Sequence, residues 1–307
     1  MRAIMMRSYG GPEVLKLEEV AEPTPLLTEV LVRVRAAGAN PVDAYMRSGA
    51  FPLLIPPAIP GWDVSGVVEA VAPGVNRFRV GDEVFGMPLF PRAAGAYAEY
   101  VAAPARQLAR KPARLDHVEA GGLSLAGLTA WQAMVDIADV KAGQRVLIHA
   151  AGGGVGHLAV QIAKARGAYV IGTASRGKHD LVRSLGADEV IDYRQADFTT
   201  LARDIDVGFD LVRSDYGVRT LDVLRPGGVL VTVDHNPELE ARAAPSGKRV
   251  AAMAVEPDHV GLEGLAELAA DGRLHVRVGE VLRLEEAARA HEVLGRGGVA
   301  GKIVLTP

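Results

Sequence analysis

Residues 146–156 read VLIHAAGGGVG, and they indicate the fold of the middle of the chain. The apolar run, the cluster of glycines and the helical pattern over Gly156–Arg166 predict a strand, a tight turn and a helix. Ala150, Gly153 and Gly156 meet the spacing A-x-x-G-x-x-G. Glycines in such a turn let backbone N–H groups approach a pyrophosphate, which the helix dipole also attracts. The stretch therefore predicts a dinucleotide site, and the alternative is an ordinary strand–helix turn.

Apolar runs alternate with helical stretches around this turn and beyond it. The predicted strands are Arg145–Ala150, Tyr169–Thr173, Glu189–Asp192, Phe209–Arg213 and Val229–Val233. Alternation of this kind is typical of a parallel sheet with helices on both faces. We therefore expect an α/β unit over residues 116–255, a doubly wound parallel sheet of the Rossmann type.

The end of the second predicted strand bears on the choice of cofactor. An NAD-type site has Asp or Glu about 20 residues beyond the glycine loop. Here Ser175, Arg176 and Lys178 stand in that place, and such donors suit the dianionic 2′-phosphate of NADPH. The alternative is a solvated polar turn. Residues 172–178 also fit the start of a P-loop, but His179 stands where Ser or Thr should bind Mg²⁺, so an ATP-dependent enzyme is a remote alternative.

The first 115 residues are rich in Pro, Gly and Val and predict an irregular β domain. Its extended runs are Val30–Val34, Val64–Val71 and Glu83–Phe85. From about residue 256 the chain has two more helical patterns and ends on an apolar strand, Lys302–Leu305. An apolar final strand needs a sheet to join, and we expect it to return to the first domain.

Composition narrows the class of protein. The 34 basic and 37 acidic residues nearly balance, which gives no overall field for nucleic acid or an anionic membrane. The absence of cysteine excludes disulfides, thiol catalysis and zinc–thiolate sites. No apolar run approaches the roughly 18 residues of a membrane span, and no signal peptide is visible. We expect a soluble cytoplasmic protein with no nucleic-acid or membrane partner.

Seven further short motifs are spread along the chain, from about residue 2 to its end. They are NPVDAYMRSG at 40–49, PGWDVSG at 60–66, VGDEVFG at 80–86, GAYAEY at 95–100, GLTAW at 127–131, LGAD at 185–188 and GKIVL at 301–305. In this order, with the glycine loop, they resemble the zeta-crystallin-like quinone oxidoreductase branch of the medium-chain dehydrogenase/reductase superfamily. The resemblance implies a GroES-like catalytic domain over 1–115, completed by about 256–307, and an NADP(H)-binding Rossmann domain.

The resemblance also implies the chemistry. The family uses NADPH to reduce quinones, or carbon–carbon double bonds conjugated to a carbonyl, in a cleft between the two domains of a homodimer. Zinc alcohol dehydrogenases share its fold, but there a Cys stands at the place of Asn40 and a His-Glu pair at the place of Trp62 and Asp63. Met87–Ala94 is too short for their four-cysteine lobe. We therefore expect no bound metal.

Residue roles follow from the same resemblance. Asn40 and Tyr45 lie on the loop that faces the nicotinamide in the family, where Tyr45 would donate a hydrogen bond or a proton to a carbonyl oxygen. The candidate cofactor-binding residues are Thr129, Gly153, Gly154, Val155, Gly156, Ser175, Arg176, Lys178, Tyr193 and Lys302. The alternatives are a core tyrosine at position 45, helix packing at 129, a strand-end aromatic at 193 and a surface lysine at 302.

Two loops depart from the family pattern. The sequence RSDYG at 213–217 stands where an Asp and a Gly-Gly pair are usual, and DHNP at 234–237 stands where a glycine is common. Both follow predicted strands at the edge where α/β proteins bind ligands, so Ser214 and Asp234 are further candidate cofactor-binding residues. The added charge favours a polar enone or enoyl substrate, as in reductases that tailor natural products, unless these charges face solvent.

Two further expectations concern partners. Apolar segments near Arg249–Val255 and Leu274–Val278 predict edge strands through which the cofactor domain would dimerise. A non-catalytic nucleotide- or RNA-binding protein of the zeta-crystallin type is a remote alternative, and the sequence contains no basic stripe with interleaved aromatics to favour it.

Overall fold

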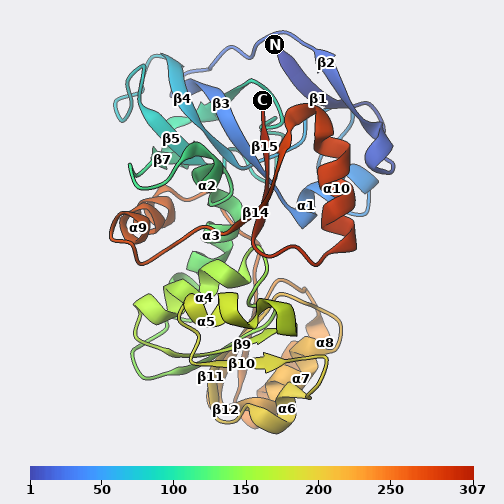
Figure 1. The fold of residues 1–307 in the computed structure, drawn as a ribbon, viewed down its shortest axis with the longest axis vertical. Helices are drawn as coiled ribbons and strands as arrows, with labels where there is room; N and C mark the ends of the chain where they lie inside the picture. Colours follow the sequence, from blue (N-terminus) through green and yellow to red (C-terminus); the bar gives the residue numbers. More distant parts are fainter. The chain divides into compact units, whose positions relative to one another are not determined.

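The computed structural model describes residues 1–307, which form two compact units. The first comprises Met1–Leu128, Glu256–Gly272 and Val276–Pro307, and the second comprises Thr129–Val255 and Arg273–His275. The chain thus leaves the first unit, builds the second and returns, so the C-terminal strand belongs with the N-terminal strands (Figure 1). No helix combines the length and the apolar character needed to cross a membrane.

The first unit contains a seven-stranded sheet. Its path runs β14 (Val278–Arg283), β15 (Lys302–Thr306), β3 (Glu29–Ala39), β4 (Val64–Val71), β5 (Glu83–Gly86) and β7 (Leu108–Arg110), with β6 (Tyr100–Pro104) paired to β3. A second, two-stranded sheet pairs β1 (Arg2–Met6) with β2 (Leu15–Glu19). The helices are α1 (Pro41–Ser48), α2 (His117–Gly121), α9 (His259–Ala270) and α10 (Ala287–Arg296). Strand β15 pairs antiparallel with β3, so the predicted return of the final strand is confirmed.

The second unit is a six-stranded sheet in which all neighbouring strands are parallel. The strands, in order across the sheet, are β10 (Glu189–Asp192), β9 (Tyr169–Ala174), β8 (Arg145–Ile148), β11 (Ile205–Asp210), β12 (Leu224–Thr232) and β13 (Arg249–Ala252). The helices are α4 (Gly156–Ala165), α5 (His179–Ser184), α6 (Phe198–Leu201), α7 (Tyr216–Val223) and α8 (Pro237–Ala243), and α3 (Ser124–Trp131) spans the junction of the units. Numbered within this sheet, the order is 3-2-1-4-5-6, which is that of the doubly wound Rossmann fold, as predicted.

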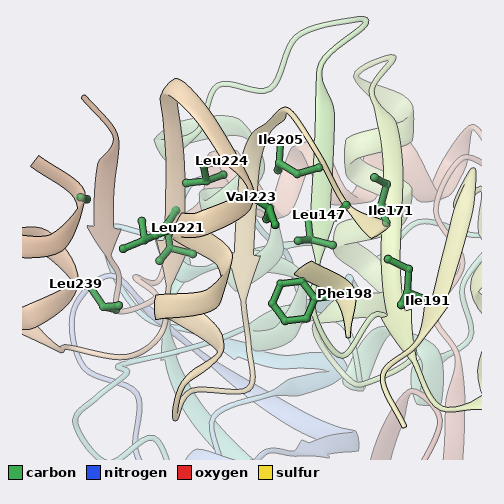
Figure 2. Close-up of a cluster of buried hydrophobic side chains, with 12 residues drawn as sticks. Leu147, Ile171, Ile191, Phe198, Ile205, Leu221, Val223, Leu224 and Leu239 are labelled. Atoms are coloured by element: carbon green, nitrogen blue, oxygen red, sulfur yellow. The ribbon is translucent and has the colours of Figure 1, made fainter. Parts of the chain in front are cut away.

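The core of the second unit is a cluster of buried apolar side chains from its strands and helices. Leu147, Ile171 and Ile191 on three adjacent strands pack with Phe198 and with Leu221 of α7 (Figure 2). All are buried, as expected for a parallel sheet covered by helices. Gly208 of β11 is needed here, because a Cβ at this position would lie 2.4 Å from the Thr220 Cγ2 atom of α7. The strands therefore end at fixed positions, and so do the loops that follow them.

Two predicted strands were wrong. Strand β11 ends at Asp210 rather than continuing to Arg213, because its ladder partners β8 and β12 pair only with residues up to 210, and Val212 is exposed. The segment Leu274–Val278 is not an edge strand of the parallel sheet, because Val278 begins β14 in the first unit. Strand β13 does lie at the edge of the parallel sheet.

Candidate functional site

The glycine loop joins β8 to α4 in the second unit. The Gly153 N–H donates to the Ala150 carbonyl at 2.8 Å, and Ala150 itself has a left-handed φ of 50°. A Cβ on Gly156 would lie 2.3 Å from the Ala150 carbonyl oxygen, so no larger residue fits there without movement. The chain therefore turns tightly and enters α4 directly, which is the backbone geometry of a pyrophosphate site.

A buried histidine, His149, lies between β8 and the glycine loop. His149 pairs with the hydroxyls of Thr220 at 2.8 Å and Thr173 at 3.2 Å, and its ring contacts those of Phe198 and Tyr216. Burial lowers the pKa of His149 to about 3, so the ring is neutral and links β8 and β9 to α7. Its role is structural. This role could have been predicted, because His149 directly follows a buried strand.

The candidate 2′-phosphate residues lie on two neighbouring turns. Ser175, Arg176 and Lys178 follow β9, Tyr193 follows β10, and the register pairs Ala174 with Asp192, so the chain leaves both strands side by side. Burial, and then the charge of Arg194, lowers the pKa of Lys178.

Arg194 is a further cation of this turn and was not among the predicted site residues. Its guanidinium lies 5.7 Å from the centroid of the Tyr193 ring. Arg194 could have been predicted as a site residue, because it directly follows Tyr193 at the end of a predicted strand.

Strand β11 ends at Asp210, and Arg213 and Ser214 lie in the loop that follows it. Both have left-handed φ values, 69° and 60°, which non-glycine residues adopt at a cost. The Asp210 carboxylate accepts the N–H groups of Val212 at 2.8 Å and Arg213 at 3.0 Å, and this fixes the turn. Burial, and to a lesser degree the charge of Asp234 on the loop after β12, raises the pKa of Asp210.

In the first unit, three buried side chains converge from distant parts of the chain. Asn40 donates from Nδ2 to the Asp63 carboxylate at 2.9 Å, and its Oδ1 accepts from the Lys302 ammonium. Lys302 also lies 3.4 Å from Asp63 Oδ2 and 3.4 Å from the Ala39 carbonyl. The Asn40 carboxamide is thus fixed from both sides, and Lys302 is a buried ion-pair partner and not a surface lysine.

A second buried group lies next to this triad. Asp43 on α1 accepts the Asn40 N–H at 2.7 Å and the Tyr97 hydroxyl at 2.8 Å, and Tyr97 also lies 3.3 Å from His291 Nε2 on α10. Burial raises the pKa of Asp43 to about 7. Burial, and then the charge of Arg47, lowers the pKa of His291 to about 3. Neither Tyr97 nor His291 was predictable as a partner of α1, because each is far from this helix in sequence.

Tyr45 lies on the outer side of the same helix. Asn40 precedes α1, Pro41 occupies its first turn, and Gly49 ends it with a φ of 80°. The inward residues Asp43 and Met46 are fully buried, whereas Tyr45 is 45% exposed. The alternative of a core tyrosine is therefore wrong. Of the other candidates, Thr129 is buried on α3, Tyr193 is 42% exposed, and Ser214 is exposed.

The residues at the positions of the zinc ligands do not fit a metal ion. Asn40 and Asp63 already bond to one another and to Lys302, and Asp63 also accepts the Leu125 N–H at 2.5 Å. The Trp62 indole N–H donates to the Arg92 carbonyl. Within residues 1–307, no group of three or more His, Cys, Asp or Glu side chains has an arrangement that could bind a metal ion.

The raised pKa of Asp43 predicts a pH-dependent effect on stability. The folded state binds this proton more tightly than the unfolded chain, so the stabilisation is present below about pH 4 and is lost as the pH rises through about 7. The Asp43→Asn variant has no ionisable group at this position, so its stability does not fall in this way as the pH rises. Between about pH 5.5 and about pH 7, the unfolding free energy of the variant should rise relative to the parent by about 1.5 kcal/mol, measured by urea unfolding. Parallel profiles for the two proteins would show that Asp43 stays ionised.

The fold and these sites together define a class. A profile described as "Alcohol dehydrogenase GroES-like domain" matches residues 27–113, and one described as "Zinc-binding dehydrogenase" matches residues 185–305. A GroES-like unit with a Rossmann unit is the architecture of the medium-chain dehydrogenase/reductase superfamily, a class of oxidoreductases that use a nicotinamide cofactor. The second profile carries zinc in its description, but Asn40, Trp62 and Asp63 lie outside the residues that it matches.

Comparison with individual proteins narrows the class further. Human quinone oxidoreductase is 34% identical over 99% of this chain and 97% of its own length, and the 2-haloacrylate reductase of a Burkholderia species is 35% identical over 99% and 98%. The quinone oxidoreductase structure from Coxiella burnetii is 36% identical with a TM-score of 0.94, covering 100% of this chain and 99% of that one. The Escherichia coli quinone oxidoreductase complexed with NADPH is 30% identical with a TM-score of 0.88, covering 100% of both chains. The chain therefore belongs to the quinone oxidoreductase branch of the medium-chain dehydrogenase/reductase superfamily.

Proposed function

We propose that the protein is an NADPH-dependent reductase that acts without metal on a quinone or an α,β-unsaturated carbonyl compound. The observation that carries the proposal is the turn after β9, where Ser175, Arg176 and Lys178 replace the carboxylate that binds the ribose of NAD. The NADPH complex of the Escherichia coli relative supports the cofactor, and the names of the human and Burkholderia relatives support the two acceptor classes.

The proposed cofactor site consists of the glycine loop and the loops that follow the strands. Its members are Thr129, Gly153, Gly154, Val155, Gly156, Ser175, Arg176, Lys178, Tyr193, Ser214, Asp234 and Lys302. NADPH, when bound, supplies the hydride. Lys302 would act indirectly, because Ala39, Asn40 and Asp63 already provide acceptors for the three donors of its ammonium group.

Tyr45 would assist the reaction by donating a hydrogen bond to the acceptor oxygen, where negative charge develops as the conjugated system accepts the hydride. The Tyr45 side chain is 45% exposed, whereas the Asn40 carboxamide is buried and bonded to Asp63 and Lys302, so Asn40 would position the helix that carries Tyr45. Without a metal to act as Lewis acid, this donor or water must stabilise the oxyanion.

Tyr45→Phe should lower kcat with enones by about 10²-fold, the low end for acid–base assistance, with little change in NADPH affinity. Quinone reduction should fall less, because a quinone is the stronger electrophile. The measurement is NADPH consumption with a panel of quinones and enones, with and without a chelator. Tyr169→Phe is the control, since this tyrosine bonds Glu189 at the surface of the second unit. Full rates for Tyr45→Phe with every accepted substrate would assign the proton to water.

The charged loops favour a second candidate within this class. Arg213 and Asp215 are exposed, and Asp234 is half-buried. An enoyl reductase that acts on a polar natural-product intermediate would use these charges. A protein that binds NADPH but turns over no acceptor in the panel would instead support the non-catalytic alternative.

The proposal includes a homodimer. Strand β13 is the outermost strand of the parallel sheet, and an unpaired edge can pair with that of a second copy. Sedimentation at micromolar concentration should give the mass of two chains, and a monomer would contradict this.

A further inference from the structure

A buried chain of hydrogen bonds joins α10 to the first turn of α1. His291 Nε2 on α10 lies 3.3 Å from the Tyr97 hydroxyl, and this hydroxyl donates to Asp43 Oδ2 at 2.8 Å. Asp43 Oδ2 also accepts the Asn40 N–H at 2.7 Å, so the chain ends on the residue that caps α1. His291 is 2% exposed, and Tyr97 and Asp43 are fully buried. Polar side chains from three separate segments are thus committed to the start of one short helix.

The direction of each bond in this chain is fixed when Asp43 is ionised. The Tyr97 hydroxyl has a single proton, which it donates to Asp43. Tyr97 therefore accepts from His291, and the one proton of the neutral imidazole lies on Nε2. Every donor faces an acceptor. Removing one member of the chain consequently leaves its neighbour as an unsatisfied polar group in the interior.

The Tyr97 ring occupies a space that the surrounding backbone leaves for it. A Cβ on Gly61 would lie 2.3 Å from Tyr97 Cδ1, and Gly61 has a left-handed φ of 93°. The Tyr97 carbonyl accepts the Ile4 N–H at 2.8 Å, which ties its backbone to β1. The ring also meets that of His291 edge-on, with the centroids 5.9 Å apart. The hydroxyl therefore has a defined position from which to hold Asp43.

The chain acts on the helix that carries Tyr45. Helix α1 has eight residues, and Tyr45 follows Asp43 by two positions. A helix of about two turns moves as a unit, so a bond that fixes its first turn also fixes the origin and direction of the Tyr45 side chain. A shift of about 1 Å in a group that contacts a substrate can lower the rate by about 10²-fold.

We propose that Tyr97 and His291 are positioning residues, which hold Asp43 and thereby orient Tyr45 toward the carbonyl oxygen of the acceptor. This rests on the proposed function, since it assumes that Tyr45 contacts the acceptor. Tyr97 and His291 act only through Asp43, because both side chains are enclosed in the first unit.

A double-mutant cycle tests the proposal at about pH 8, where Asp43, with its pKa of about 7, is ionised. Tyr97→Phe should lower kcat with enones by about tenfold and leave the KM for NADPH unchanged. In the Tyr45→Phe background, the same change should lower kcat by less than about twofold, because the hydroxyl that the chain orients is already missing. A purely structural role of Tyr97 would instead lower kcat by the same factor in both backgrounds, or lower only the stability.

His291 provides a second pair of variants that does not depend on Tyr97→Phe. His291→Gln keeps an N–H donor near the place of Nε2 and should retain most of the kcat, whereas His291→Leu has no donor and should lose as much as Tyr97→Phe. Tyr100→Phe is the matched control, because it removes a tyrosine hydroxyl that bonds Arg33 in the same unit. This control should keep the kcat of the parent. Urea unfolding establishes that each variant is folded under the conditions of the assay.

The outcomes separate this inference from the proposed function. Equal losses of kcat from Tyr97→Phe with and without the Tyr45 hydroxyl would overturn the inference and leave the proposed function standing. Equal kcat values for His291→Gln and His291→Leu would do the same. Full activity of Tyr45→Phe would also overturn it, since the chain would then have no side chain to act through. If the parent turns over no quinone or enone, both the proposed function and the inference fail.

Discussion

Replacing Lys302 by Met is expected to lower the free energy of unfolding by about 3–5 kcal/mol. The ammonium group is buried against Asp63 and Asn40, so its removal leaves the Asp63 carboxylate without its cationic partner in an interior from which water is excluded. Chemical unfolding followed by circular dichroism measures the loss as a shift of the midpoint.

Two further variants make this result specific to the buried pair. Lys141→Met removes a partner of Asp139 at 2.6 Å, but both side chains are exposed, so the cost should be below about 1 kcal/mol. Combining Lys302→Met with Asp63→Asn should recover part of the loss, because neither charge then remains. If Lys302→Met costs no more than Lys141→Met, the ion pair does not stabilise the first unit.

Removing Arg176 and Lys178 together, as the double alanine variant, should weaken NADPH binding by at least about 10²-fold and leave NADH binding nearly unchanged. A hydrogen bond to a charged group contributes about 1.5–3 kcal/mol, and the variant removes two potential partners of the 2′-phosphate. The parent should correspondingly prefer NADPH over NADH by tenfold or more. Calorimetric titration with both cofactors measures the affinities.

Arg183→Ala provides the control for this pair. Arg183 is an exposed residue of α5 that lies 3.7 Å from Asp180, and its loss removes one positive charge where the double variant removes two. Its variant should lose little NADPH affinity beyond general charge effects. Equal affinities of the parent for NADPH and NADH would refute the assignment of the turn after β9 to the 2′-phosphate.

Several elements were predictable because their signals are local. The glycine loop, the helix after it and strand β10 depend on residues that are close in sequence, and β10 was predicted with the bounds that the structure has. The position of Ser175, Arg176 and Lys178 follows directly, since they are the next residues after a recognisable strand. Their grouping with Tyr193 needed only the parallel pairing of β9 and β10.

Strand β11 shows where local signals end. Leu211 and Val212 are apolar and extend the pattern of Phe209, but the strand stops at Asp210 because its neighbours β8 and β12 offer no further partners. Arg213 and Ser214 therefore lie in the loop after the strand, and their left-handed φ values could not be predicted from the residue types.

The sequence by itself determined the class of fold, the alternation of strands and helices along the chain and the cationic turn, because periodicity, glycine spacing and charge are carried by neighbouring residues. Only the tertiary structure joined Lys302 to Asp63, which is 239 positions away, and Tyr97 to His291, which is 194 positions away. These contacts depend on the chain returning to its first sheet through β15 and α10. Burial then makes Lys302 an ion-pair partner, and it leaves Tyr45 exposed while Tyr97 is enclosed.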